Sequence, residues 1–381
     1  MIQNFIPQSL KPLLRFLYYK NEREKVFREI KIRRQQNNIL STYQLNSIEN
    51  LIVFLCEGTN WFTGKDDISG GILSIASIYE ETRKLTSIHN SFVIMATHPD
   101  AHLLFKHTQF PNDIPVFRFS QLKLFRNLKS VMIHVPEYQF NKNLTDRFKS
   151  TFQYLCVKNI HINILNQRID IMPSPSIINS ISKEGFYITQ TTAHEQYSTL
   201  KNRQKYGIPL HKLSVYATPE RYAFNKLERK ENLILVSPDE VEHKKSILQK
   251  LKEELPYYTI RIINGISYME YLELVSKAKF TITFGEGLDF YFIETIYSGG
   301  ISFAKYNREF FTADFEKLEG IFDTYEDMHQ KICAVIKQLD ESEQMYKATN
   351  KKQFNACHKI YNAKFYNENL VRFYRKQFSY S

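Results

Sequence analysis

Two glutamates on either side of a predicted helix start carry the strongest chemical signal in this chain. Glu286 and Glu294 are separated by seven residues in Phe284-Gly-Glu-Gly-Leu-Asp-Phe-Tyr-Phe-Ile-Glu294. If the helix begins near Asp289, Glu294 lies one to two turns inside it and Glu286 stays in the preceding loop. A ligand there would meet anion-favouring amides between two hydrogen-bond acceptors, which suits a nucleotide sugar. The alternative is a pair of solvated glutamates at a helix start.

A second loop has the composition to approach a ligand through its backbone. Ser69-Gly70-Gly71 stands just before another predicted helix. Without side chains, backbone N–H groups and a helix N-terminus can come close to an anion or a sugar. The same glycines would also suit an ordinary turn, so both interpretations stay open.

The other candidates for chemistry have no partner at a recognisable spacing. His98 follows a predicted strand, where a structural role in the loop is the stronger interpretation, and His194 and His211 predict no metal site. The chain has neither a Gly-x-Ser-x-Gly motif nor a Walker loop. Its four cysteines lie far apart with no Cys-x-x-Cys pair, which argues against disulfides and zinc. We therefore expect neither a metal nor a cofactor.

The elements that must position these residues alternate between short apolar strands and longer helical segments, a pattern typical of parallel α/β folds. The expected strands are 51–56, 91–97, 116–119, 131–135, 160–165, 186–191, 233–236, 259–263, 280–284 and 301–304. The expected helices are 72–85, 144–156, 244–255, 268–278 and 289–297, followed by a largely helical tail over 327–378. A capping box from Ser267 to Glu270 favours a helix start there. Such folds bind ligands beyond the carboxyl ends of their strands, where both loops would lie.

The charge of the chain implies an acidic partner. The formal net charge is +11, and residues 11–34 hold nine Lys or Arg against three Glu, interleaved with apolar side chains. This basic amphipathic segment would suit an anionic membrane surface, or equally a solvated helix packed on the body. No RNA-binding motif accompanies the dispersed aromatic residues, so no nucleic-acid partner is expected.

The apolar pattern predicts a globular protein without a membrane span. Hydrophobic residues make up 43% of the chain and charged residues 24%, and no apolar stretch approaches the ~18 residues that cross a bilayer. No signal peptide is recognisable at the N-terminus. We expect a cytoplasmic protein, peripheral on the inner face of the plasma membrane.

The carboxylate segment resembles the Glu-x7-Glu signature of retaining glycosyltransferases of family 4 and its relatives. Their usual form is Glu-Gly-Phe-Gly-Leu-Pro, two further residues, Glu and then Ala-x-x-x-Gly, whereas here Glu286-Gly287 and Glu294 precede Ser298-Gly299-Gly300. The resemblance extends as a pattern of elements from Asn50 onward and is sharp over 233–304. It implies the GT-B fold, in which two Rossmann-like doubly wound α/β domains face each other across a cleft and C-terminal helices follow.

Matched position by position, the resemblance implies roles for individual residues. It places Glu286 on the sugar hydroxyls, Lys244 against the leaving diphosphate and His134 beside the donor sugar as the catalytic set. It places Glu294 on the ribose hydroxyls and Glu137 on the acceptor side. The remaining donor contacts are implied for Gly287, Leu288, Asp289, Gly265, Lys245, Gly70 and Gly71.

Three positions depart from the family pattern. Asp289 replaces the second glycine and brings a negative charge close to the phosphates. Pro238 stands where the family has an arginine, a contact that Lys305 or Arg308 would have to replace. Asn166-Gln167 replaces a further histidine that many relatives carry.

The expected function is transfer of a hexose-type sugar from a nucleoside-diphosphate sugar to a glycan or lipid-linked acceptor in surface polysaccharide biosynthesis, with retention and without a metal. The expected parts are a basic arm over 1–45, an acceptor domain over 46–218, a nucleotide-sugar domain over 219–355 and a C-terminal helix over 356–381 that packs back on the first domain. Two alternatives stay open. One is a non-catalytic glycosyltransferase-like partner subunit, motivated by Asp289 and Pro238. The other is an inverting GT-B enzyme with His134 or His98 as its base.

Overall fold

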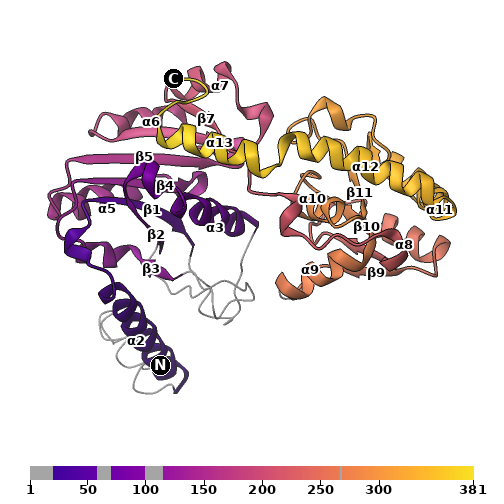
Figure 1. Cartoon of the computed structure of the whole chain (residues 1–381), viewed down its shortest axis with the longest axis horizontal. Helices are drawn as coiled ribbons and strands as arrows, with labels where there is room; N and C mark the ends of the chain where they lie inside the picture. The colour runs from indigo at the N-terminus through magenta and orange to yellow at the C-terminus, as the bar shows by residue number, and fades with distance from the viewer. Residues whose placement is uncertain (1–19, 58–69, 99–114, 267) are drawn as a thin grey trace, which may run out of the picture.

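The computed structural model describes residues 20–57, 70–98, 115–266 and 268–381. It contains two parallel β-sheets, each covered by helices, in two bodies that lie side by side (Figure 1). The chain builds the first sheet, then the second, and its last helix crosses back over the first body. The predicted α/β class with two Rossmann-like halves and C-terminal helices is therefore confirmed.

Seven strands form the first sheet in the order β3-β2-β1-β4-β5-β6-β7, and all neighbours are parallel. Their bounds are Asn50–Cys56 (β1), Phe92–Thr97 (β2), Val116–Arg118 (β3), Ser130–Pro136 (β4), Asn159–Asn166 (β5), Tyr187–Thr192 (β6) and Leu210–Lys212 (β7). Both faces are covered, which explains why β1 is an unbroken apolar run. Of the described strands in this sheet, β7 was not predicted, because its sequence Leu-His-Lys contains a single apolar residue and gives no strand pattern.

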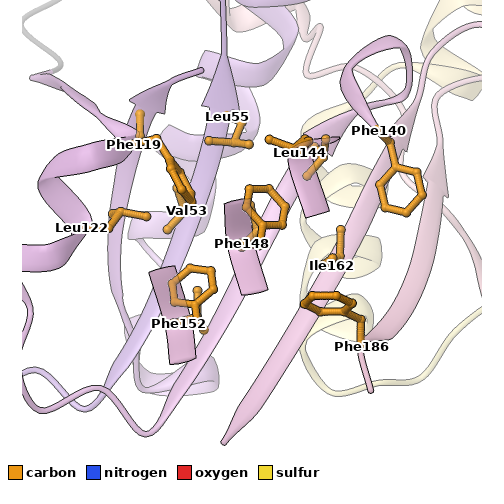
Figure 2. Packing of buried hydrophobic residues seen from close by; sticks show 14 of the residues in the cluster. Val53, Leu55, Phe119, Leu122, Phe140, Leu144, Phe148, Phe152, Ile162 and Phe186 are labelled. Carbon is orange, nitrogen blue, oxygen red and sulfur yellow. The ribbon is translucent and has the colours of Figure 1, made fainter. Parts of the chain in front are cut away.

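Helices cover the two faces of this sheet. They are α3 (Gly70–Arg83), α4 (Thr86–His89), α5 (Lys142–Tyr154), α6 (Pro175–Ser182) and α7 (Leu200–Tyr206). Phe148 and Phe152 of α5 are fully buried and project toward the strands, near Val53 of β1 and Ile162 of β5 (Figure 2). The amphipathic pattern of α5 thus secures one face of the sheet.

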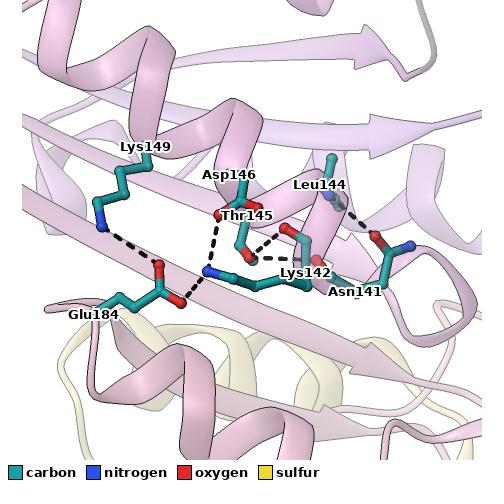
Figure 3. A network of polar contacts seen from close by, with 7 residues as sticks. All are labelled: Asn141, Lys142, Leu144, Thr145, Asp146, Lys149 and Glu184. Carbon is teal, nitrogen blue, oxygen red and sulfur yellow. Dashed lines mark hydrogen bonds and ion pairs between the residues drawn. The ribbon is translucent and has the colours of Figure 1, made fainter.

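Polar contacts fix the ends of α5 and α6. The Asn141 side chain accepts a hydrogen bond from Leu144 N at 3.0 Å and so caps α5. Lys142 and Lys149 of α5 both pair with Glu184, which follows α6 (Figure 3). These ion pairs are largely exposed and add little stability, so they serve to align the two helices.

Five parallel strands form the second sheet in the order β12-β11-β10-β8-β9. Their bounds are Glu231–Val236 (β8), Thr259–Ile262 (β9), Ala278–Thr283 (β10), Ile301–Lys305 (β11) and Ile321–Phe322 (β12). The helices of this half are α8 (Lys244–Glu254), α9 (Tyr268–Lys277), α10 (Phe290–Tyr297), α11 (Tyr325–Glu341) and α12 (Glu343–Ile360). Short 3-10 turns occur at Leu45–Ser47, Phe119–Leu124, Glu137–Gln139, Ile169–Ile171, Glu195–Tyr197, Pro219–Arg221, Leu227–Arg229 and Ala313–Phe315.

Each sheet has a point where the strand order reverses. In the first sheet it lies between β1 and β4, and in the second between β8 and β10. Loops at the carboxyl ends of the strands on either side of such a point diverge, and open α/β sheets bind their ligands there. The loops after β4, β8 and β10 are therefore the places to search for a site.

The last helix, α13 (Ala363–Tyr374), returns to the first body. The Tyr374 hydroxyl lies 2.9 Å from Thr82 Oγ1 and 3.1 Å from His134 Nε2. Beyond the helix, Tyr380 forms an antiparallel bridge with Leu210 of β7. The chain therefore ends as part of the first body.

The first described helix, α2 (Lys20–Ser41), docks through its C-terminal half and projects with its N-terminal half (Figure 1). Gln36 Nε2 donates to Val116 O at 2.7 Å, Arg118 Nε donates to Gln36 Oε1 at 3.0 Å, and Leu40 is buried. Val26 and Ile30 are exposed on the projecting half. The helices in the described part of the chain include none with the length and apolar content to cross a bilayer.

Candidate functional site

A cavity of about 440 Å³ lies between the two bodies. The first body lines it with residues from the loops after β4, β5 and β6 and from the start of α3. The second body contributes the loops after β9 and β10 together with α9 and α10. Its size falls in the range of small-molecule sites, and it opens at the carboxyl ends of both sheets.

The loop after β10 turns tightly because two glycines adopt positive φ. Gly285 has a φ of +70° and Gly287 a φ of +82°. A Cβ atom on Gly287 would lie 2.8 Å from Phe311 Cε2 and 3.1 Å from Lys305 O, so only glycine fits there. Thr283 Oγ1 donates to Gly287 O at 2.8 Å and fixes the turn. Gly287 thus shapes the loop that presents Glu286 and Leu288 to the cavity.

Asp289 caps helix α10, which begins at Phe290 as the sequence predicts. Its Oδ1 accepts a hydrogen bond from Phe292 N at 3.0 Å. Burial raises the pKa of Asp289 well above its ordinary value, although the Phe292 N–H opposes the rise. The helix N-terminus that would attract a diphosphate therefore already carries a carboxylate from the same chain.

Glu294 lies on α10 at the wall of the cavity and is 1% exposed. The Tyr268 hydroxyl donates to its Oε1 at 3.2 Å, whereas Oε2 has no hydrogen-bond partner among the described residues. Burial raises the pKa of Glu294 to about 7. The hydroxyls of Tyr271, Tyr268 and Tyr222 stabilise the ionised carboxylate and so oppose this rise. The Tyr271 and Tyr222 hydroxyls thus lie near the carboxyl without completing a hydrogen bond to Oε2, and a ligand or water can supply that donor.

Glu286 faces a cation from the other body. Burial raises the pKa of Glu286, and the positive charge of Arg168 opposes the rise. Arg168 lies in the loop after β5 and also lines the cavity. Arg168 was not among the predicted site residues, although its position three residues beyond the end of the predicted strand 160–165 was an available signal.

Glu137 follows β4 and lines the cavity from the first body. Its Oε1 accepts a hydrogen bond from Arg168 N at 2.9 Å. Burial raises the pKa of Glu137 to about 7, and backbone N–H groups of residues 137, 168 and 167 oppose the rise. The carboxyl therefore joins the loops after β4 and β5, and its expected contact with an acceptor stays a prediction.

The lysines implied for the diphosphate do not line the cavity. Lys244 is buried, and its Nζ donates to the backbone carbonyls of Ser237 at 3.1 Å, Pro238 at 3.1 Å and Asp239 at 2.8 Å. Its charge thus organises the loop after β8, and the structure does not support a direct role against a leaving group. Lys245 is exposed outside the cavity.

The substitute cations are also placed elsewhere. Lys305 Nζ lies 4.9 Å from the centroid of the Tyr325 ring, and Arg308 is exposed outside the cavity. The positive charge of Arg221 acts on Glu294 and lowers its pKa. The Arg221 side chain does not line the cavity, and its Nη1 donates to Ser77 Oγ and Tyr216 O.

His134 is fully buried beneath α13 and does not line the cavity. Its Nε2 lies 3.1 Å from the Tyr374 hydroxyl, its Nδ1 lies 3.1 Å from Asn163 Nδ2, and its ring stacks on Phe54. Burial lowers the pKa of His134 well below its ordinary value. The structure therefore places His134 in the packing beneath α13 and apart from the cavity, and its implied contact with the donor sugar and its alternative role as a base stay predictions.

The other histidines divide between packing and the cavity. His98 packs edge-on against Phe119, and His211 Nε2 lies 2.7 Å from Asn369 O of α13. His194, which the sequence analysis set aside, lines the cavity after β6 and packs edge-on against Phe310 of the second body. Burial lowers the pKa of His194 to about 3, so its ring is neutral near pH 7. Across the described ranges, no group of three or more His, Cys, Asp or Glu side chains is arranged to hold a metal ion.

The predicted glycines lie at the edges of the site. Helix α3 begins at Gly70, and Gly71 lines the cavity. Gly265 has a φ of +66° in the loop after β9, while its neighbours Ile263 and Ile266 line the cavity. Ser69 and the capping residue Ser267 lie outside the described residues.

No protein-family model matches the chain, and no curated protein matches it by sequence. Among solved structures, it is similar to HepE from Anabaena, solved in complex with UDP-glucose, with a TM-score of 0.56 and 8% identity. The match covers 86% of this chain and 99% of that chain. Sucrose-phosphate synthase from Thermosynechococcus elongatus gives a TM-score of 0.49 and 10% identity over 86% of this chain and 99% of that chain. At such identity the likeness to HepE concerns the fold, and the architecture is GT-B.

Proposed function

We propose that this protein is a glycosyltransferase that moves a hexose-type sugar from a nucleoside-diphosphate sugar to a glycan or lipid-linked acceptor. The proposal includes retention of anomeric configuration, as the resemblance to family 4 implies, and a place in surface polysaccharide synthesis. The GT-B architecture supports the donor class only as a fold, since folds host many functions. Support for a nucleotide-sugar donor therefore comes from the residues that line the cavity.

The observation that carries the proposal is Glu294. A buried carboxylate with one oxygen paired to Tyr268 and the other unpartnered among the described residues is costly unless a ligand donates to it. Two adjacent hydroxyls of a ribose would supply such donors. The apolar side chains of Ile263 and Ile266 beside it offer a surface for a nucleobase.

In the proposed reaction, the bond between the sugar C1 and the β-phosphate oxygen breaks, and its electron pair stays on that oxygen. The hydroxyl oxygen of the acceptor bonds to C1, and its proton passes to the departing diphosphate. Glu286, half-buried across from the first body, would accept hydrogen bonds from sugar hydroxyls and hold C1 in place. A cavity between two bodies would exclude water that otherwise hydrolyses the donor.

The test is a thermal-shift screen of the purified full chain against a panel of nucleotide sugars, with EDTA present. UDP-glucose, the ligand of HepE, is a reasonable first donor. A donor that binds the folded state must raise the melting temperature. We expect one donor to do so, and the shift to disappear in Glu294→Ala. Glu316→Ala, at an exposed glutamate outside the cavity, is the matched control and should keep the shift.

Activity is then measured as transfer of radiolabelled sugar from that donor to lipid-extract or glycan acceptors. Glu286→Gln should bind donor yet lose most transfer, and the anomer of the product decides between retention and inversion. A panel in which no donor shifts the wild-type protein would overturn the proposal.

A non-catalytic sugar-binding partner is the second candidate, and Asp289 favours it. A carboxylate that caps α10 removes amides that a diphosphate would use. This candidate predicts that Glu286→Gln preserves the biological role of the protein in cells, whereas a transferase would lose it.

We further propose that α2 rests on an anionic membrane surface on the cytoplasmic side. The projecting half of α2 exposes Val26 and Ile30 among basic residues, and a lipid-linked acceptor would be reached from that surface. Residues 11–19 of the expected arm lie outside the described residues.

A further inference from the structure

The cavity is unusually acidic for a site that would hold a diphosphate. Four carboxylic side chains line it, namely Glu137, Glu286, Asp289 and Glu294. A nucleoside diphosphate brings further negative charge, and its departure adds more at the β-phosphate. Some cation must therefore face the phosphates.

The second body does not supply that cation to the cavity. Lys244 donates to three backbone carbonyls of its own loop, and Lys245, Lys305 and Arg308 are absent from the described lining. The single Lys or Arg side chain among the described residues that line the cavity is Arg168, from the first body.

Arg168 is both available and held in place. Asp170 binds its Nε at 3.1 Å and its Nη2 at 2.5 Å, which leaves Nη1 without a hydrogen-bond partner among the described residues. The backbone of Arg168 is fixed by the hydrogen bond from its N–H to Glu137. Its side chain is 51% exposed, so a ligand can reach it.

We infer that Arg168 is the residue that binds the donor diphosphate and offsets the charge of the leaving group, from the first body across the cavity. The inference rests on the proposed function. A guanidinium can form two parallel hydrogen bonds to phosphate oxygens, which a lysine cannot. Asp170 and Glu137 are positioning residues that aim this group.

With Arg168 on the diphosphate, the two parts of a donor would contact different bodies. Glu294 and the nucleoside pocket belong to the second body, whereas Arg168 belongs to the first. The nucleoside and the phosphates are then held by different bodies, so a donor joins them and its diphosphate stabilises the closed arrangement.

The experiment uses nucleotide probes instead of an unidentified sugar. Isothermal titration measures the affinity of UDP, GDP and ADP, each with its nucleoside, for wild-type protein and for Arg168→Gln and Arg168→Lys. Arg126→Gln is the matched control, because Arg126 is an exposed arginine of the same body outside the cavity. Circular dichroism establishes that each variant is folded.

We expect Arg168→Gln to weaken the preferred diphosphate by about 10- to 100-fold, as loss of charge-assisted hydrogen bonds implies. Arg168→Lys should recover part of that loss, the nucleoside should bind all variants equally, and Arg126→Gln should match wild type. Equal diphosphate affinity in wild type and Arg168→Gln would overturn the role of Arg168 while leaving the proposed function intact. Failure of every nucleotide and nucleoside to bind the wild-type protein would overturn both.

Discussion

At the scale of single residues, the buried carboxyl of Glu294 connects stability with ligand binding. Burial raises its pKa to about 7 from an ordinary value of 4.5. The folded state therefore holds the proton more tightly than the unfolded state. The free energy of unfolding contributed by this carboxyl therefore falls as pH rises from 4.5 to 7. Above pH 7 the group is ionised in both states, and the contribution no longer changes with pH. A ligand that donates to the carboxylate would recover part of this loss.

We predict that Glu294→Gln, which lacks this ionisation, gains stability relative to wild type as pH rises. The difference in free energy of unfolding should grow between pH 4.5 and 7 by up to about 3 kcal/mol and then level off. Urea denaturation at pH 4.5, 6 and 8 measures it. A difference that is constant with pH would contradict the prediction, and Glu316→Gln at an exposed site is the control.

At the same scale, Lys244 and Arg168 differ in whether the protein leaves their charge available to a ligand. Lys244 matches the lysine of the family pattern in sequence, yet its Nζ is surrounded by the carbonyls of Ser237, Pro238 and Asp239. Arg168 matches nothing in that pattern, yet it lines the cavity. A charged side chain can bind a ligand only if its hydrogen-bond donors are not already used by groups of the protein.

At the scale of elements, the start of α10 combines a cap and a binding site in one position. Asp289 accepts from Phe292 N and stabilises the helix, but its charge lies where a diphosphate would approach. A change that removes the charge but keeps the cap should therefore alter donor affinity, whereas a change that also removes the cap should lower stability as well.

We predict that Asp289→Asn keeps the capping oxygen and raises UDP affinity at a pH above that at which Asp289 ionises, because it then removes a like charge near the phosphates. Asp289→Ala should also lose the cap, at a cost of about 1 kcal/mol in the free energy of unfolding. Urea denaturation and UDP titration measure the two effects separately.

Asn141→Ala is the matched control for this experiment, because Asn141 caps α5 away from the cavity. It should lower stability by a similar amount without changing UDP affinity. Equal UDP affinity in wild type and Asp289→Asn would show that the carboxylate does not face the phosphates.

At the scale of the whole molecule, α13 and α2 attach the two ends of the chain differently. Helix α13 follows the second body but is bound to the first through Tyr374 and Tyr380. Helix α2 docks at the edge of the first sheet through Gln36 and projects beyond it. Helix α2 therefore projects from the first body, and α13 links the two bodies.

We predict that the full chain binds vesicles of phosphatidylglycerol but not of phosphatidylcholine, and that added salt weakens the binding. Replacing Val26 and Ile30 together by Asp should reduce binding at least about tenfold, since it removes apolar contact and adds repulsion. Cosedimentation measures both effects.

Ile177→Asp is the control for the vesicle experiment, because Ile177 is a comparably exposed residue of α6. It should leave binding unchanged. Equal binding of wild type and the double variant would place the membrane contact elsewhere or exclude it.

The linear pattern of apolar and polar residues was enough to predict the order of most elements in this protein. Apolar runs such as 51–56 and 280–284 became β1 and β10, since strands buried on both faces need continuous apolar side chains. The helix start at Asp289 and the turn at Gly287 were also predictable, because capping and positive φ are local properties of the chain.

The tertiary structure alone decided which charged groups meet. His134 lies within β4, and α13, from the far end of the chain, returns to cover it. Arg168 and Glu286 come from different bodies, 118 residues apart in sequence, and line one cavity. Neither outcome is local, because burial and long-range charge proximity depend on how two independently built sheets are placed against each other.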